Sequence, residues 1–170
     1  AVLGLAEHYP FARALVNSGR LSVPSFLADS RLNTADEAAF AGNMIPGAPM
    51  DDAPIEAAGG LHWLLEAVGN RFQVLHYMED AAALDGATAA VFARLADAPI
   101  PVEAIVVAAR GTAPGGLKTL IDAQGRIRER YDLQPGSTYL LRPDQHVAAR
   151  WRSLDAVKVH AAVARATCNA

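Results

Sequence analysis

The stretch LLRPDQHVAARW, residues 140–151, brings together residue types that perform acid–base chemistry and bind anions. His146 could serve as a general base, because an imidazole titrates near neutral pH. Arg142 and Arg150 could hold a carboxylate or a phosphate through paired hydrogen bonds. A histidine base needs a nucleophile or an acid partner, however, and none lies at a suitable local spacing. The stretch therefore favours a solvated or interface face over a catalytic centre, with an anion or partner contact as the functional alternative.

The same stretch predicts a β-hairpin with a three-residue loop of Pro143, Asp144 and Gln145. This loop places Arg142, His146 and Arg150 on one exposed, cationic face and leaves the other face apolar, whereas a one-residue slip would mix the two sets. The third loop residue, Gln145, must then adopt the left-handed conformation, with some strain. The expected pairs are Arg142 with His146, Leu140 with Ala148, Thr138 with Arg150, Leu141 with Val147, Tyr139 with Ala149, and Ser137 with Trp151.

Outside the hairpin, no pattern of catalytic or metal-binding residues is recognisable. His62 and His76 lack the i, i+4 spacing of a helical metal pair, and the sequence contains no HExxH. His76 lies in an apolar stretch, which is typical of a core histidine with a hydrogen-bond partner. The stretch GTAPGG lacks the GK[ST] of a phosphate loop, and no GxGxxG fingerprint occurs. We therefore assign no catalytic, cofactor-binding or metal-binding residue.

The composition indicates a folded domain with an aliphatic core. Hydrophobic residues make up 52% of the 170 residues and charged residues 19%, which excludes a disordered chain. The net charge of −3 and the lack of a basic run argue against nucleic-acid binding. No apolar stretch approaches the roughly 18 residues of a membrane span. The single cysteine, Cys168, excludes an internal disulfide and a CxxC pair and favours a cytoplasmic location.

The elements that would position the hairpin begin with a strand–helix–strand unit. Residues 71–78 alternate between two largely apolar sets, as in a strand covered on both faces. Residues 80–98 predict a helix with Asp80 as a possible N-cap, and residues 102–109 predict a second buried strand parallel to the first. The inner stripe of the helix would be Leu84, Ala87, Val91 and Leu95.

A short helical segment after Gly125, the hairpin and a last helix complete the predicted order. Ser153 is the expected N-cap of that last helix, which would bury Cys168. Its inner stripe would be Leu154, Val157, Ala161, Ala164 and Cys168. This order predicts a thioredoxin-like α/β fold, with a central mixed sheet of βαβ and antiparallel hairpin, flanking helices and a preceding irregular linker.

Residues 21–54 carry the proline, glycine, asparagine and aspartate residues that predict such a linker, wrapped on a surface. One local signal lies inside it. Thr34 and Glu37 have the spacing of a capping box, which predicts a helical turn through Phe40 that ends at Gly42.

Several of these stretches resemble the C-terminal part of FAD-dependent aromatic-ring hydroxylases, the flavoprotein monooxygenases that include phenol hydroxylase and 3-(3-hydroxyphenyl)propionate hydroxylase. The most specific is LLRPDQHVAARW, with its RPD-x-HVA-x-R pattern, followed by PGAPMDDAP at 46–54. FQVLHY and IDAQGRIRERYDL also match. The resemblance implies that residues 1–20 are the tail of an upstream flavin domain, 21–54 a linker and 55–170 a thioredoxin-like domain.

The resemblance also implies a parent oxidoreductase that hydroxylates an aromatic ring with FAD, NAD(P)H and dioxygen. The flavin and substrate sites would lie upstream, so this chain would hold no cofactor and be inactive alone. In the family this domain has no redox centre and a packing or dimer-contact role, which implies the upstream flavin domain and a second copy as partners, without nucleic acid or membrane. The stretch MEDAA at 78–82 stands where a thioredoxin carries CxxC, in agreement. Gln145 departs from the glycine that the family often has.

Two alternatives remain open. A free-standing thioredoxin- or peroxiredoxin-like redox protein fits the order of elements, but its only thiol would be Cys168, far along the chain from the helix N-terminus where activated cysteines usually lie. A small binding or association module would use Arg142, His146 and Arg150 as its contact surface.

Overall fold

The computed structural model of the chain describes residues 8–9, 24–57 and 59–169, so the prediction for residues 1–20 lies almost entirely outside the described residues. The elements are, in chain order, β1 (Pro54–Ala57), β2 (Gly60–Trp63), α3 (Leu64–Ala67), β3 (Phe72–Asp80), η1 (Ala81–Ala83), α4 (Gly86–Ala96), β4 (Val102–Arg110), η2 (Pro114–Gly116), β5 (Lys118–Ile121), α5 (Arg126–Arg130), β6 (Thr138–Leu141), β7 (Val147–Trp151) and α6 (Ala156–Ala166). Among the described residues, no helix has the length and apolarity needed to cross a membrane.

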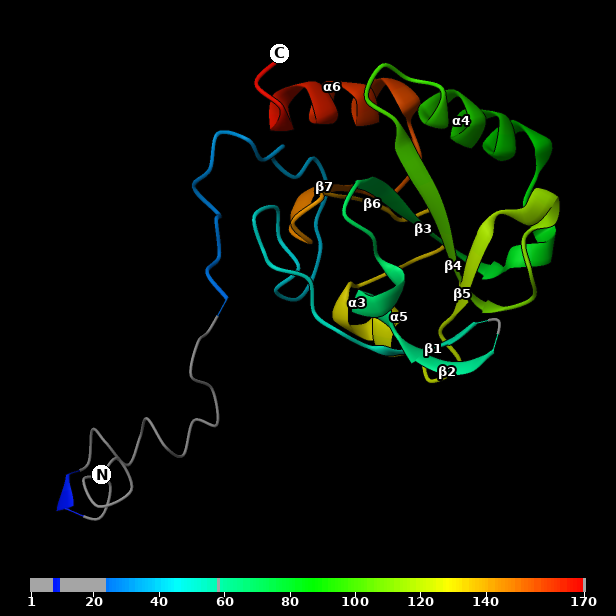
Figure 1. Cartoon of the computed structure of the whole chain (residues 1–170), viewed down its shortest axis with the longest axis horizontal. Coiled ribbons are helices and arrows are strands. Elements are labelled where there is room, and N and C mark those ends of the chain that lie inside the picture. The colour runs from blue at the N-terminus through cyan, green and yellow to red at the C-terminus, as the bar shows by residue number, and fades with distance from the viewer. Residues whose placement is uncertain (1–7, 10–23, 58, 170) are drawn as a thin grey trace.

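One seven-stranded sheet, in the order β2-β1-β5-β4-β3-β6-β7, organises these elements. Strands β3, β4 and β5 are parallel to one another, and the remaining neighbours pair antiparallel. The predicted βαβ unit is confirmed as β3, α4 and β4, and the predicted hairpin is β6 and β7. Figure 1 shows α4 and α6 over one side of the sheet and α3 and α5 on the other.

The central strands are apolar on both faces because a hydrophobic layer covers each. Leu75 and Ile105 belong to the core beneath α3 and α5. Val74 and Val106 alternate with them and belong to the core beneath α4 and α6. This period-two alternation between two buried faces produces the nearly continuous apolar runs seen in the sequence.

The helix predicted over residues 80–98 is divided in two. Asp80 caps only the short η1, by accepting a hydrogen bond from the amide of Ala82 at 3.0 Å. Asp85 caps α4, whose inward residues are Phe92 and Leu95. The predicted inner stripe was therefore partly wrong. Leu84 lies before α4, and of the other three predicted residues only Leu95 is buried. Ala87 is exposed, and Phe92 takes the central position.

The last helix also starts later than predicted. Asp155, not Ser153, is the N-cap of α6. At about 100° per residue, the expected stripe lies on the side of the helix opposite to the residues that are buried. Val157 is consequently 76% exposed, and the buried residues are Val159, Ala162 and Val163. The helix ends at Ala166, and Cys168 lies beyond it, exposed and with a φ of 58°. The prediction that Cys168 is buried was wrong.

Three short strands were not predicted. The hairpin of β1 and β2 and the parallel strand β5 extend the sheet beyond β4. Each has only four residues, and glycine-rich stretches precede β2 and β5. The short helical segment expected after Gly125 is confirmed as α5, with Gly125 at a φ of 67°.

The region predicted as a linker is irregular in residues 24–53, but part of it is built into the domain. Met44, Ala48, Met50 and Ala53 lie in the core beneath α3 and α5. Residues 33–50, here called the edge segment, lie beside β7 (Figure 1). The predicted helical turn from Thr34 to Gly42 does not form, because the amide of Thr34 donates to the carbonyl of Ala148 at 2.9 Å instead.

Candidate functional site

The loop of the β6–β7 hairpin forms as predicted. The amide of Arg142 donates to the carbonyl of His146 at 2.9 Å, and Gln145 has a φ of 61°. The Gln145 side-chain amide donates to the carbonyls of Leu65 at 3.1 Å and Val68 at 3.3 Å. Carbonyls at the end of a helix have no partner within the helix, so Gln145 caps α3. This contact offsets the strain of the left-handed backbone.

The predicted pairing is confirmed for Leu141 with Val147 and was wrong beyond this pair. Leu141 pairs with Val147, but a β-bulge follows, so that Leu140 pairs with Ala149 and Tyr139 with Arg150. Ala148 is the extra residue. A one-residue insertion turns every later side chain to the opposite face. Arg150 therefore does not share an exposed face with Arg142 and His146.

Arg150 is buried, with 4% of its surface exposed. Its guanidinium donates to both carboxylate oxygens of Asp36, at 2.9 and 2.7 Å, and to the carbonyl of Met44 at 3.1 Å. Burial by itself lowers the pKa of Arg150, but the hydrogen bonds and charges of Asp36 and Tyr139 together more than offset this, so the pKa is raised. Arg150 thus binds the edge segment and carries a fixed positive charge.

Arg152 makes a second set of contacts with the same segment. It donates to the carbonyl of Ala39 at 2.8 Å and forms an ion pair with Asp132. The pKa of Asp132 is lowered, first by the hydrogen bond from the amide of Ala41 and then by Arg152.

Phe40 completes this arrangement. The guanidinium carbons of Arg150 and Arg152 lie 4.5 and 3.7 Å from the centre of the Phe40 ring, and the ring meets Tyr139 edge to face at 5.9 Å. Cations over an aromatic ring are attracted to its negative face. We call Asp36, Phe40, Asp132, Arg150 and Arg152 the arginine clamp.

Arg142 and His146 remain at the hairpin loop. Arg142 forms an ion pair with Asp144 at 2.6 Å, and its side chain is 15% exposed. His146 lies with its Nδ1 3.1 Å from the carbonyl oxygen of Asp144, and its backbone pairs with Pro49. The proposed base and its two arginines are thus separated into a loop contact and a buried clamp, and they do not converge on one ligand.

The position that holds the cysteines in a thioredoxin is the end of β3. Here the carboxylate of Asp80 accepts hydrogen bonds from the amide of Ala82 and from Arg110 Nε, both at 3.0 Å. A Cβ on Gly111 would lie 2.4 Å from Asp80 Oδ1, so this corner is packed tightly. An ion pair therefore fills the position, which contains no thiol, and Cys168 lies after α6.

His76 is a core residue, as predicted. Its Nδ1 lies 2.9 Å from Thr138 Oγ1, which itself donates to the carbonyl of Gly136, so the ring nitrogen is the donor. The ring meets Phe92 edge to face. Burial lowers the pKa of His76 to about 4, against a smaller opposing effect of Asp85. His62 lies in β2, several strands away, and no metal-binding group of three or more side chains exists within the described ranges.

Comparison with known proteins assigns this domain to a family. The sequence profile of the HcaD C-terminal domain matches residues 53–166. The chain belongs to the HcaD C-terminal domain family. A search of curated proteins found no match to this member of the family.

Several solved structures share the fold of this HcaD C-terminal domain chain. The flavin-dependent monooxygenase PieE, solved with FAD and substrate, matches with a TM-score of 0.56 and 21% identity, over 99% of this chain and 32% of that one. Aklavinone-11 hydroxylase, solved with FAD and aklavinone, matches with a TM-score of 0.57 and 21% identity, over 81% and 25%. The thiol peroxidase from Chromobacterium violaceum matches with a TM-score of 0.56 and 12% identity, over 72% and 88%. The resemblance to flavoprotein hydroxylases and the thioredoxin-like α/β fold are confirmed, and the chain spans a third or less of the two monooxygenases.

The turn after β3 and the arginines of the hairpin do not fit FAD. A flavin pyrophosphate binds where glycine amides at a helix N-terminus face it. The turn after β3 instead presents the carboxylate of Asp80, which would repel a phosphate. The arginines of the hairpin are occupied by Asp36, Asp132 and Asp144.

The sequence did not reveal the partners of the clamp. Asp36 lies within the stretch that resembles a capping box, and Asp132 follows a short helix, so neither has a local pattern that marks it. The available signal was the pair of arginines two residues apart in a strand, whose charge required partners if buried.

Proposed function

We propose that the chain is the C-terminal, non-redox thioredoxin-like domain of an FAD-dependent, NAD(P)H-using aromatic-ring hydroxylase, with a structural role. The observation that carries the proposal is the family match over residues 53–166, on a fold shared with two FAD-containing monooxygenases. The hydroxylase activity, the use of NAD(P)H and the aromatic substrate belong to the proposed parent, and this chain contributes no reacting group to them.

The geometry of the clamp supports a structural role. The edge segment is held by a buried ion pair, a second ion pair and backbone hydrogen bonds. A segment bound this tightly fixes the direction in which the chain enters the domain. We propose the layout of residues 1–20 as the tail of the flavin domain, 21–54 as the connection and 55–170 as the domain. The partners would be that flavin domain and a second copy of the chain, in the cytoplasm.

The full-length protein provides the test. We expect its reading frame to carry a GxGxxG strand–turn–helix upstream of this chain. The purified protein should show a flavin absorbance band and oxidise NADH or NADPH faster when phenolic compounds are added. A full-length protein without flavin would contradict the proposal.

A thiol peroxidase function is the second candidate, and the likeness to the Chromobacterium violaceum enzyme favours it. The exposed Cys168 would have to be the reacting thiol. We expect the chain to show no peroxidase activity with a thiol reductant. Peroxide reduction that a Cys168→Ser change abolishes would establish this alternative instead.

A further inference from the structure

One face of the sheet is covered over only part of its width. Helices α4 and α6 pack on the face that carries Val74 and Val106, whereas no helix covers β5 and β1 on this side in the described part of the chain. The cause is the connection from β4 to β5. Parallel strands are usually joined by a dozen or more residues that include a helix. Here residues 111–117 make the crossing, with only the three-residue η2.

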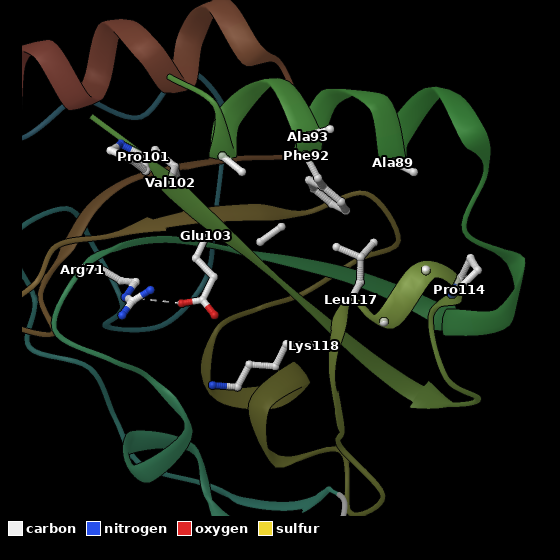
Figure 2. Close-up of a pocket in the computed structure, with 14 residues that line it drawn as sticks. Arg71, Ala89, Phe92, Ala93, Pro101, Val102, Glu103, Pro114, Leu117 and Lys118 are labelled. Atoms are coloured by element: carbon white, nitrogen blue, oxygen red, sulfur yellow. Dashed lines mark ion pairs between the residues drawn. The ribbon is translucent and has the colours of Figure 1, made fainter. Parts of the chain in front are cut away.

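A groove occupies the place of the missing helix. It has a volume of about 830 Å³ and runs between α4, the start of β4 and η2. Figure 2 shows Phe92 projecting from α4 toward Leu117, which lies beside η2. A second hollow of about 570 Å³ shares Gly116 and Leu117 with the groove and continues over β5 and β1. The two together form an elongated bare strip.

The walls of this groove are apolar, and its charged groups lie at one end. Phe92, Val102 and Leu117 line it together with three alanines of α4, Ala89, Ala93 and Ala96. At the other end of the groove from Pro114, Arg71 is paired with Glu103 at 3.8 Å and remains 65% exposed (Figure 2). The ammonium of Lys118 donates to the carbonyl of Ala67 in α3, and no ion pair among the described residues includes it. This end of the groove therefore has unneutralised positive charge.

We propose that the groove receives an amphipathic α-helix from the flavin-binding part of the parent protein. Its apolar face would pack on α4 and Leu117, and a carboxylate at one end would meet Arg71 and Lys118. This inference rests on the proposed function. A helix fits because the bare strip is elongated and replaces a crossover helix. The parent is the source because the fold covers only 32% and 25% of the two monooxygenase chains, so most of each such chain lies outside this domain.

The first test compares two substitutions on α4 in the full-length protein. Ala93 and Ala90 are both exposed on this helix, but only Ala93 lines the groove. We expect Ala93→Glu to lower the melting temperature by several degrees and to speed flavin loss, because it adds bulk and a charge that repels the acidic end of the helix. The matched Ala90→Glu change should leave both values unaltered. Equal effects of the two changes would overturn the inference.

The second test measures accessibility and does not depend on a loss of stability. Ala93→Cys and Ala90→Cys are compared in the folded full-length protein by their rates of reaction with a thiol reagent. We expect the Ala93→Cys variant to react at least tenfold more slowly. Equal rates in a protein that holds its flavin would overturn this inference alone, whereas a protein without flavin would overturn the proposed function. Protection that disappears on dilution to monomer would assign the groove to a second copy and overturn the choice of occupant.

Discussion

The two edges of the sheet differ in whether another segment of the chain covers them. At the β7 edge, Val147 exchanges backbone hydrogen bonds with Gly47 and Ala48, at 2.7 and 2.9 Å, and the arginine clamp fixes the segment that supplies them. At the β2 edge, no further strand follows within the described residues, and Leu61 and Trp63 are 65% and 49% exposed. An open edge carries unpaired backbone groups that can pair with another chain. The chain covers one such edge with its own linker, and its described residues leave the other bare.

The bare edge has few of the usual protections. Its strand, Gly60–Trp63, contains no lysine, aspartate, glutamate or proline. The amide of Leu64 donates to the carbonyl of Ala53, so by the alternation of an antiparallel pair the backbone groups of Leu61 point away from β1. The main protection is shortness, because four residues offer few hydrogen bonds. The covered edge therefore contributes to the stability of the domain, whereas the described residues leave the backbone groups of the other edge open to another strand.

Breaking the clamp should have the largest effect. We expect Arg150→Met to lower the free energy of unfolding by about 3–4 kcal/mol, because it leaves Asp36 and the carbonyl of Met44 without their buried partner. Denaturation by urea measures the loss. Arg150→Lys should recover only part of it, since an ammonium cannot bond both oxygens of Asp36 in the same way.

The matched control lies in the same hairpin. Arg142→Met removes an ion pair whose acid, Asp144, is 47% exposed, so we expect a loss of at most about 1 kcal/mol. If both substitutions cost the same, the covered edge does not owe its stability to the clamp.

Mild acid should weaken the centre of the sheet before the covered edge. Burial lowers the pKa of His76 from 6.5 to about 4, so the unfolded chain binds this proton more readily than the folded one. The contribution of neutral His76 to the free energy of unfolding is fully present above pH 6.5. It is lost as the pH falls toward 4, by about 3 kcal/mol in all. The lowered pKa of Asp132 keeps that part of the clamp ionised over this range.

Unfolding by urea at several pH values provides the measurement. A His76→Gln variant should lose most of the dependence on pH between 6.5 and 4, whatever its absolute stability. A variant with the slope of the original protein would show that another group titrates.

The part of the fold predicted from the sequence depends on local patterns. Two apolar runs around a helix predicted the βαβ unit, and Pro143 with two polar residues predicted the three-residue loop and the left-handed Gln145. The bulge was not predictable. Val147, Ala148 and Ala149 are three consecutive small apolar residues, so either register buries an alanine equally well. The position of the extra residue decides whether Arg150 is exposed or buried.

The clamp depends on pairs that are distant in sequence. Arg150 and Asp36 are 114 residues apart, and neither has a neighbour that indicates the other. The prediction of an exposed cationic face failed for this reason, because the pleat of a strand gives the relative direction of side chains but not what covers each face. The same limit applies to β1, β2 and β5, which are too short to show a period of their own.

Gln145 connects the two sides of the sheet. It lies in the loop between β6 and β7, and its side chain contacts α3, the helix that follows β2. Gln145→Gly would remove the left-handed strain, which favours the variant, but also both hydrogen bonds to Leu65 and Val68. We expect a net loss of about 1 kcal/mol and faster amide exchange in α3. A gain in stability would show that the strain outweighs the cap.

The smallest effect on folding is expected at the bare edge, where the effect on association should be clearest. Leu61→Lys places a charge on an exposed side chain of β2, so we expect a change in unfolding free energy within about 0.5 kcal/mol. A lysine on an edge strand opposes pairing with another chain, because the approaching strand would have to bury its charge. Light scattering at rising protein concentration should therefore show less self-association than in the original protein. Val157→Lys is the control, since Val157 is also exposed, at 76% against 65% for Leu61, but lies on α6 and has no free strand edge. If both lysines reduce association alike, the added charge alone is responsible, and the two edges of the sheet do not differ in the way the structure indicates.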